Sequence, residues 1–244
     1  MFKKDSIDIV IPLSSGSKHD NFELRMALRS IARHVKNCGQ IRVITDSPPA
    51  WLDNCQVLSC PDKYLHNKDA NIIRKLLTAA NETDLSDQFL FWSDDQVALR
   101  SFNASSLPPI FNRRSAEAFH PDRIWHRRML HTFDYLQKHD LPLNCNWESH
   151  TPQRIDKALF QQLLKNVDYI TEPGLAVNTI YFGLAGTCSG MEQSCIKLTV
   201  EKPLKLGKLP DNKLFIGYND NAWQGDLPQL LMEKFPRPCC YERT

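Results

Sequence analysis

The chain has 244 residues, of which 42% are hydrophobic, 9% aromatic and 24% charged. This balance excludes a disordered, collagen-like or coiled-coil protein, and the length fits one large domain or two tightly fused halves. The sequence contains 30 lysines and arginines and 28 aspartates and glutamates, which gives a net charge of +2. A chain so close to neutral is not expected to coat nucleic acid, although a local basic patch stays open.

Two features bear on where the chain resides. No apolar stretch approaches the roughly 20 residues needed to span a bilayer. The apolar residues 7–13 are too few for a secretion signal, include Asp8 and lack a small-residue cleavage site. We therefore expect a cytoplasmic protein without a transmembrane segment. Its eight cysteines form no C-x-x-C pair of the kind that zinc fingers use, so we expect them to be reduced and mostly structural.

The N-terminal part of the sequence alternates between strand and helix patterns. β-Branched and apolar runs predict strands at residues 6–13, 41–46, 55–60 and 88–93. Apolar residues at helical spacing predict a helix over 22–35, stopped by Gly39, and a second over 69–80. This order predicts an α/β fold, a Rossmann-like mixed and mostly parallel sheet flanked by helices in a single large domain.

The pattern changes after about residue 99. A Ser/Pro-rich connector at 101–109 leads to a segment rich in histidine and arginine, residues 113–131. Beyond it, the patterns predict two helices and one strand: 129–139, 152–166 with Thr151 as N-cap and Pro152 in the first position, and 178–183.

The most informative feature is the pair Asp94-Asp95, directly after the apolar strand 88–93. Ligands of open α/β sheets bind outside the carboxyl ends of the strands. Two carboxylates there suit Mg²⁺ or Mn²⁺, which take oxygen ligands and are often completed by substrate phosphates. A plain surface turn or a helix N-cap is an equally good interpretation of the dipeptide.

Cations gather at the starts of both predicted helices. Lys68 and Asn71 flank the start of the helix 69–80, and Arg74 follows within a turn, where free backbone N–H groups favour phosphate. The alternative is a charged first turn that faces solvent. Arg25 and Arg29 lie on one face of the first helix and suit a phosphate, an acidic loop or simply solvent.

Two further polar groups stand out in the C-terminal half. His150 precedes the predicted helix 152–166 and suits a base, a metal ligand or a phosphate partner, although a lone histidine is more often structural. Asp220 follows the apolar residues 214–216 and would bring another acid to the site, unless it belongs to a plain turn. The glycine-rich phosphate loops, the G-x-S-x-G elbow and the H-E-x-x-H zinc motif are absent from the sequence.

The order of these segments resembles the Stealth family, which includes capsular polysaccharide phosphotransferases and the N-acetylglucosamine-1-phosphotransferase of lysosomal enzymes. Its core is similar to the GT-A fold of nucleotide-sugar glycosyltransferases. Four segments carry the resemblance: 8–13 (DIVIPL), 23–31 (ELRMALRSI), 41–52 (IRVITD and PAWL) and 89–95 (FLFWSDD). Weaker matches follow at 150–152, 218–220 and 235–242. The loop 14–18 and the segment 66–71 depart from the family, and 66–71 is closer to ordinary GT-A glycosyltransferases.

The resemblance implies a nucleoside-diphosphate sugar donor and Mn²⁺ or Mg²⁺ as cofactor. It assigns Asp95 to the metal, and Asp94 to the metal or the donor. The other donor-binding residues would be Pro12, Leu13, Arg25, Asp46, Lys68, Asn71 and Arg74. Asp220 or His150 would activate an acceptor hydroxyl.

Residues 1–110 would then form the nucleotide-sugar-binding half, and 111–244 the acceptor-binding half with the C-terminal elements. The acceptor itself stays open between a glycan, a lipid-linked saccharide, a protein and a modified nucleic acid. Three functions follow from the sequence: a metal-dependent glycosyltransferase, a Stealth-like sugar-1-phosphate transferase, and a non-catalytic module that binds nucleotide or glycan.

Overall fold

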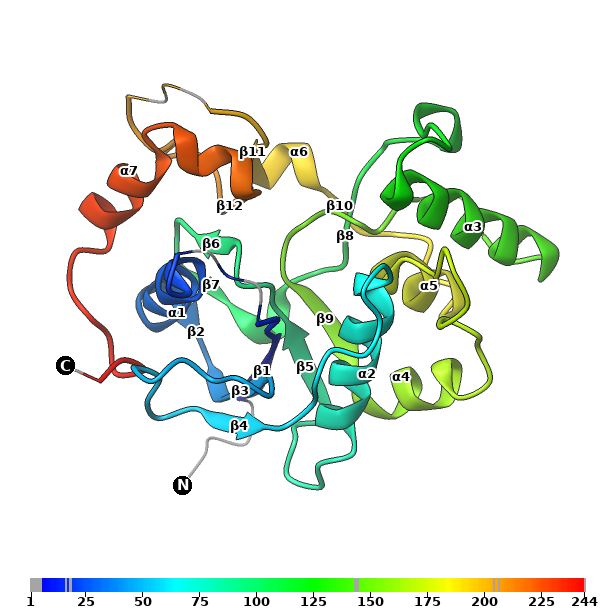
Figure 1. The fold of residues 1–244 in the computed structure, drawn as a ribbon, viewed down its shortest axis with the longest axis horizontal. Coiled ribbons are helices and arrows are strands. Elements are labelled where there is room, and N and C mark those ends of the chain that lie inside the picture. Colours follow the sequence, from blue (N-terminus) through cyan, green and yellow to red (C-terminus); the bar gives the residue numbers. More distant parts are fainter. Residues whose placement is uncertain are drawn as a thin grey trace.

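A computed structural model describes residues 6–15, 17, 19–142, 145–203, 205 and 207–243. Its main sheet has five strands in the spatial order β4-β3-β1-β5-β9 (Figure 1). The first four of these run parallel, and β9 is antiparallel to β5. Their bounds are β1 Ile7–Pro12, β3 Cys38–Ile44, β4 Gln56–Leu58, β5 Gln88–Phe91 and β9 Gln153–Asp156.

The alternating side chains of β1 explain why it lies at the centre of this sheet. Ile9 and Ile11 pack on one face against α1 (Phe22–His34), whereas Val10 packs on the other face against α2 (Lys68–Ala80). Two further helices cover the α2 face, α4 (Lys157–Leu164) and α5 (Val177–Leu184) (Figure 1). A strand with apolar side chains on both faces is typical of a buried parallel sheet.

A second sheet of three strands lies on the α1 side, in the order β11-β12-β6. β12 is parallel to β11 and antiparallel to β6. Because β6 begins directly after Asp95, the chain passes from the main sheet into the second sheet through the Asp94-Asp95 turn. The bounds are β6 Gln96–Ala98, β11 Lys197–Val200 and β12 Phe215–Tyr218.

The remaining elements are shorter or peripheral. Two pairs of short parallel strands are formed, β2 with β7 and β8 with β10. α3 packs beside α5 on the right of Figure 1, and α7 lies near the C-terminal end. The bounds are β2 Val35–Lys36, β7 Phe102–Asn103, β8 Ile110–Phe111, β10 Met191–Glu192, α3 Ile124–Lys138, α6 Gln193–Ile196 and α7 Leu227–Lys234.

The structure confirms a mixed α/β fold with a parallel-rich main sheet. The four strands and two helices predicted for the N-terminal part are present, and the predicted helix 129–139 falls within α3. The division at residue 110 stays a prediction. The main sheet itself draws on both parts of the chain, since β9 pairs with β5 at its edge. Among the described residues, no helix is both long enough and apolar enough to cross a bilayer.

Two predicted elements are wrong. The predicted helix 152–166 is a strand followed by a helix, because residues 153–156 pair with the open edge of β5 and bury Ile155. The helix α4 begins only after Asp156, whose Oδ1 accepts a hydrogen bond from the Leu159 N–H at 2.9 Å. The predicted strand 178–183 is the helix α5, whose buried apolar residues satisfy either pattern.

The predicted role of Gly39 as a helix stop is also wrong. α1 ends at His34 and the chain turns at Asn37, whose φ of 56° is left-handed. Gly39 lies inside β3 against the carboxylate of Asp8, where a Cβ atom would collide with that side chain.

The connections of the main sheet create a crevice. From β1 the chain crosses through α1 to β3 on one side, whereas α2 carries it back to β5 on the other side of β1. Connections that leave in opposite directions separate at the carboxyl ends of the two central strands, and ligands of doubly wound sheets bind there. The crevice lies between the ends of β1 and β5.

Candidate functional site

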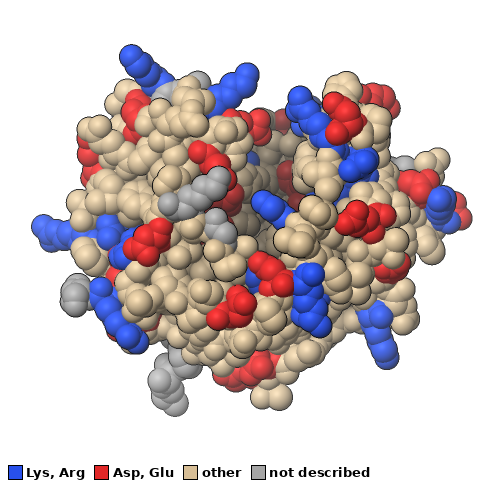
Figure 2. All heavy atoms as spheres, viewed as in Figure 1, with Lys and Arg blue, Asp and Glu red and all other residues tan. Residues whose placement is uncertain are grey.

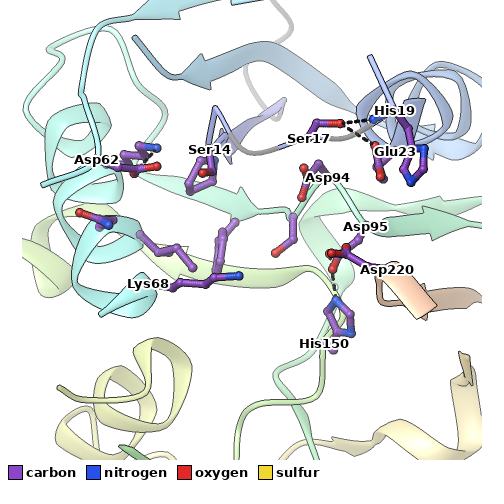
Figure 3. A pocket seen from close by; sticks show the side chains of 16 residues that line it. Ser14, Ser17, His19, Glu23, Asp62, Lys68, Asp94, Asp95, His150 and Asp220 are labelled. Atoms are coloured by element: carbon purple, nitrogen blue, oxygen red, sulfur yellow. Dashed lines mark hydrogen bonds and ion pairs between the residues drawn. The ribbon is translucent and has the colours of Figure 1, made fainter. Parts of the chain in front are cut away.

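A pocket of about 340 Å³ occupies this crevice (Figure 3). Side chains enter it from the carboxyl ends of β1 and β5, from the starts of α1 and α2, and from loops before β9 and after β12. Figure 2 shows that this face of the molecule is hollowed near its centre, where acidic and basic side chains meet. Of the residues predicted from sequence, those that line the pocket are Pro12, Lys68, Asn71, Asp94, Asp95, His150 and Asp220.

Carboxylates outnumber lysines in the pocket wall. The wall contains five acidic residues and two lysines. The acidic residues are Glu23, Asp62, Asp94, Asp95 and Asp220, and the lysines are Lys68 and Lys75. Such an excess repels an anionic ligand unless a bound cation offsets it.

The pKa of Asp94 reflects both its burial and this repulsion. Burial, together with the charges of Asp95 and Glu23, raises the pKa of its carboxyl to about 7. Glu23 enters the cluster from the first turn of α1, where it accepts a hydrogen bond from the Ser17 hydroxyl at 3.2 Å. A cation held between these oxygens would favour their ionised forms.

Asp95 is paired with His150 across the pocket (Figure 3). The Nε2 atom of His150 lies 2.9 Å from Asp95 Oδ1, and both side chains are about one-third exposed. That oxygen atom is itself buried and accepts no hydrogen bond of ordinary geometry from the described residues. A carboxylate oxygen in this state has capacity for a further ligand.

The backbone of His150 is held in an uncommon conformation. Its φ of 53° is left-handed, a region that residues other than glycine adopt uncommonly. The Lys197 ammonium donates to the Ser149 carbonyl at 2.7 Å, directly before His150. On the other side lies Gly217 of β12, where a Cβ atom would stand only 2.8 Å from the His150 carbonyl oxygen. The second sheet therefore fixes the histidine opposite Asp95.

Tyr218 lies behind the acidic cluster. Its hydroxyl is buried and has no hydrogen-bond partner among the described residues. Burial raises the pKa of Tyr218, and the nearby charges of Asp95, Asp94 and Glu23 raise it further. The hydroxyl therefore stays protonated beside the carboxylates, and no negative charge is added there.

The two lysines differ in their surroundings. The buried Lys75 ammonium donates to the Leu13 carbonyl at 2.6 Å and lies 2.7 Å from Asp62, so its charge is already neutralised. Lys68, the first residue of α2, is exposed and extends across the pocket (Figure 3). Within the described chain its ammonium forms no ion pair, which leaves it available to an anion.

Asn71 lines the pocket but serves its own loop. Its Oδ1 accepts from the Lys63 and Tyr64 N–H groups at 2.9 and 3.2 Å, and its Nδ2 donates to the Tyr64 carbonyl. The side chain therefore positions the segment that leads to Lys68. The predicted direct contact between Asn71 and a nucleotide-sugar donor gains no support from these hydrogen bonds.

Four predicted residues do not line the pocket: Leu13, Arg25, Asp46 and Arg74. The Leu13 side chain is buried in the core, and only its carbonyl serves the site, through Lys75. Asp46 follows β3 but stays exposed outside the pocket. Arg74 donates to the Pro61 carbonyl at 3.0 Å.

Arg25 and Arg29 share one face of α1, as predicted, and the group they grip is Glu242. Arg29 binds this buried carboxylate through two nitrogens, at 2.7 and 2.8 Å, and Arg25 Nη1 lies 3.3 Å from it. The guanidinium of Arg25 also lies over the Trp51 ring. These arginines hold the C-terminal segment on α1 and are committed to the fold.

Sequence reasoning missed several residues that line the pocket, among them Ser17, His19, Glu23 and Asp62. Asp62 carried no signal, because a single charge in a loop does not reveal its partner. Glu23 was discoverable, since an acid in the first turn of a helix that follows a central strand lies near that strand's carboxyl end.

The residues present fit a hard divalent cation shared with a ligand. No three His, Cys, Asp or Glu side chains within the described part of the chain converge closely enough to hold a metal alone. Mg²⁺ and similar ions are, however, commonly held by one or two carboxylates plus substrate phosphates. Asp94 and Asp95 supply two carboxylates, and Asp95 Oδ1, which faces His150, accepts no hydrogen bond of ordinary geometry from the described residues.

No protein-family model matches this chain, and no curated protein matches its sequence. Function is therefore inferred from the pocket.

Proposed function

We propose that the protein is a metal-dependent glycosyltransferase of GT-A-like fold, which moves a sugar from a nucleoside-diphosphate sugar to an acceptor hydroxyl. One observation carries this proposal. An acidic pair, Asp94 and Asp95, follows the central parallel strand β5 at the switch point of the sheet. The ammonium of Lys68, which forms no ion pair with the described residues, lies across the pocket. A dianionic diphosphate needs both features, a cation on the acidic side and a positive group on the other.

Asp94 and Asp95 would hold Mn²⁺ or Mg²⁺. The bound ion would supply charge neutralisation for the departing diphosphate. The protein's own residues have separate tasks. Lys68 binds the phosphates as a point charge from the first turn of α2, where backbone N–H groups also favour anions.

His150 and Asp220 divide the remaining work. Because His150 Nε2 faces Asp95 at 2.9 Å, its contribution is to orient that carboxylate. Asp220, which is exposed at the pocket edge, is the better candidate for accepting the proton of an acceptor hydroxyl.

Thermal-shift measurements with a panel of nucleoside-diphosphate sugars, with and without Mn²⁺, test the proposal. One donor should stabilise the wild-type protein only when Mn²⁺ is present, as mass-action linkage requires. The Asp95→Asn variant should lose this effect. Asp46→Asn is the matched control, because Asp46 also follows a parallel strand but lies outside the pocket. Cation-dependent stabilisation that persists in Asp95→Asn would refute the assignment.

The nucleotide released from the identified donor separates the remaining alternatives. A glycosyltransferase releases the nucleoside diphosphate, whereas a Stealth-like sugar-1-phosphate transferase releases the monophosphate. Donor binding without release of either, across glycan, lipid-linked, protein and nucleic-acid acceptors, would favour a non-catalytic binding module.

A further inference from the structure

The segment rich in histidine and arginine forms a second polar cluster, outside the pocket. It surrounds His126, which lies in the first turn of α3 and is only 4% exposed. Arg114, Arg123 and His120 lie around this ring, and all three side chains are exposed. These residues do not line the pocket, and the proposed transfer reaction assigns them no task.

Both ring nitrogens of His126 face hydrogen-bond donors. The His120 backbone N–H donates to Nδ1 at 2.9 Å, so the proton of the neutral ring resides on Nε2. Nε2 in turn lies 3.4 Å from Arg114 Nη2, a guanidinium nitrogen that cannot accept a hydrogen bond. Burial lowers the pKa of His126, and the charges of Arg114 and Arg123 lower it further, which favours the neutral ring. An N–H group and a guanidinium therefore meet with no acceptor between them.

The surroundings share this surplus of donors and positive charge. The N-terminus of α3 has no side-chain cap and no acidic residue in its first turn. Within the described residues, Arg114 and Arg123 form no ion pair, and the two acids of the segment, Glu117 and Asp122, do not neutralise them through such a contact. Arg114 is held in place, since it donates to the Ala118 carbonyl at 2.8 Å and lies over the Phe119 ring.

We propose that Arg114, His126 and Arg123 form a binding site for a phosphate group, either free phosphate or the terminal phosphate of a small organic molecule. An oxygen of the phosphate accepts from both His126 Nε2–H and Arg114 Nη2–H, and Arg123 balances the remaining charge. The uncapped N-terminus of α3 adds the backbone donors that commonly bind phosphate.

Nuclear magnetic resonance of the histidine ring nitrogens tests this directly. In phosphate-free buffer the His126 ring should show the Nε2–H tautomer. Inorganic phosphate, titrated at constant ionic strength, should shift the His126 signals saturably and leave those of His139 unchanged. Signals are assigned by their loss in His126→Gln. Glycerol 3-phosphate, titrated in the same way, distinguishes the sources: similar or tighter binding indicates an organic phosphate ligand, and binding of inorganic phosphate alone indicates the free ion.

Arg113 provides a matched control. It is adjacent to Arg114 and exposed, but its guanidinium is paired with Glu192 at 2.6 Å. Arg114→Gln should weaken phosphate binding by about tenfold or more, as expected for a lost charge-assisted hydrogen bond, whereas Arg113→Gln should change it by less than about twofold. An unshifted His126 signal, or equal weakening by the two variants, would overturn the proposal. Shifts of His19 and His150 in place of His126 would do the same, because they would locate the phosphate in the pocket between β1 and β5.

Discussion

His150 Nε2 and Asp95 Oδ1 lie 2.9 Å apart, although one residue belongs to the loop before β9 and the other to the β5–β6 turn. The contact joins the edge of the main sheet to the acidic turn, and β12 of the second sheet supports it through Gly217. Three separate segments of the chain therefore define the position of one carboxylate.

The first prediction concerns this contact. His150→Asn keeps a residue that tolerates a left-handed backbone but removes the imidazole beside Asp95. Turnover of the donor identified by thermal shift should fall by roughly 10- to 100-fold, and the Mn²⁺ concentration needed for half-maximal turnover should rise. His139→Asn, on the exposed end of α3, should have neither effect. An unchanged Mn²⁺ requirement would show that His150 does not orient Asp95.

The second prediction concerns Lys68. Lys68→Gln removes the exposed ammonium from the pocket, and the Kd of the nucleotide-sugar donor should rise by about tenfold or more, since hydrogen bonds to charged groups contribute about 1.5–3 kcal/mol. Calorimetric titration at two salt concentrations measures the effect, and the salt dependence of binding should weaken in the variant. Lys63→Gln, an exposed lysine outside the pocket, should bind like the wild type. Equal affinities for the two variants would argue against a phosphate contact.

The third prediction is a pH dependence of stability at Glu148. This carboxylate accepts N–H groups of Asn178 and Thr179 at the start of α5, at 2.8 and 2.9 Å. Burial, together with the charge of Asp69, raises its pKa to about 7. The folded state therefore retains a proton that the unfolded state has already lost above its ordinary pKa of 4.5, so this group lowers stability as the pH rises from about 4.5 to about 7.

Glu148→Gln, which keeps an acceptor oxygen, removes this dependence. Between pH 4.5 and pH 7 the wild type should lose on the order of 1–2 kcal/mol of unfolding free energy relative to the variant, a value reduced for the partial exposure of the side chain. Thermal melts across this range measure it, at roughly 2–4 °C per kcal/mol. Glu201→Gln, an exposed acid, should track the wild type. Parallel curves for Glu148→Gln and wild type would contradict the prediction.

The fourth prediction concerns the C-terminal segment. Burial alone would raise the pKa of Glu242, but hydrogen bonds from Arg29 and from the Cys239 amide outweigh it and leave the pKa below its usual value. Glu242→Gln leaves the 8%-exposed Arg29 without its counter-charge, so the unfolding free energy should fall by about 3 kcal/mol at neutral pH. Urea denaturation measures this change.

The sign of the pH dependence provides a second check on Glu242. Because its pKa is lowered in the folded state, the stability that it contributes is present at neutral pH and is lost as the pH falls through the folded pKa. The gap between wild type and Glu242→Gln should therefore close in acid. Asp53→Asn serves as control, since Asp53 is 44% exposed and lies 3.8 Å from Arg243 in the same segment. A loss equal to that of Glu242→Gln would show that the pairing with Arg29 is not the cause.

Local patterns in the chain were enough to predict the elements around the site. The two-sided apolar character of β1 and the helical spacing in α1 and α2 predicted the α/β order, and Asp94-Asp95 was placed at a strand end because it directly follows an apolar run. Those features depend on neighbours in the chain, so periodicity and composition reveal them.

Only the folded structure showed which side chains and strands are in contact. Residues 153–156 became a strand because the edge of β5 offered hydrogen bonds that outweigh the helical pattern, and Arg25 turned to Glu242 because the C-terminal segment returns to α1. Likewise, both Lys75 and Lys68 lie on α2, but the charge of Lys75 is neutralised because Asp62, in the loop before α2, forms an ion pair with Lys75 and not with Lys68. Long-range pairing depends on how the sheet is connected, and spacing along the chain does not encode it.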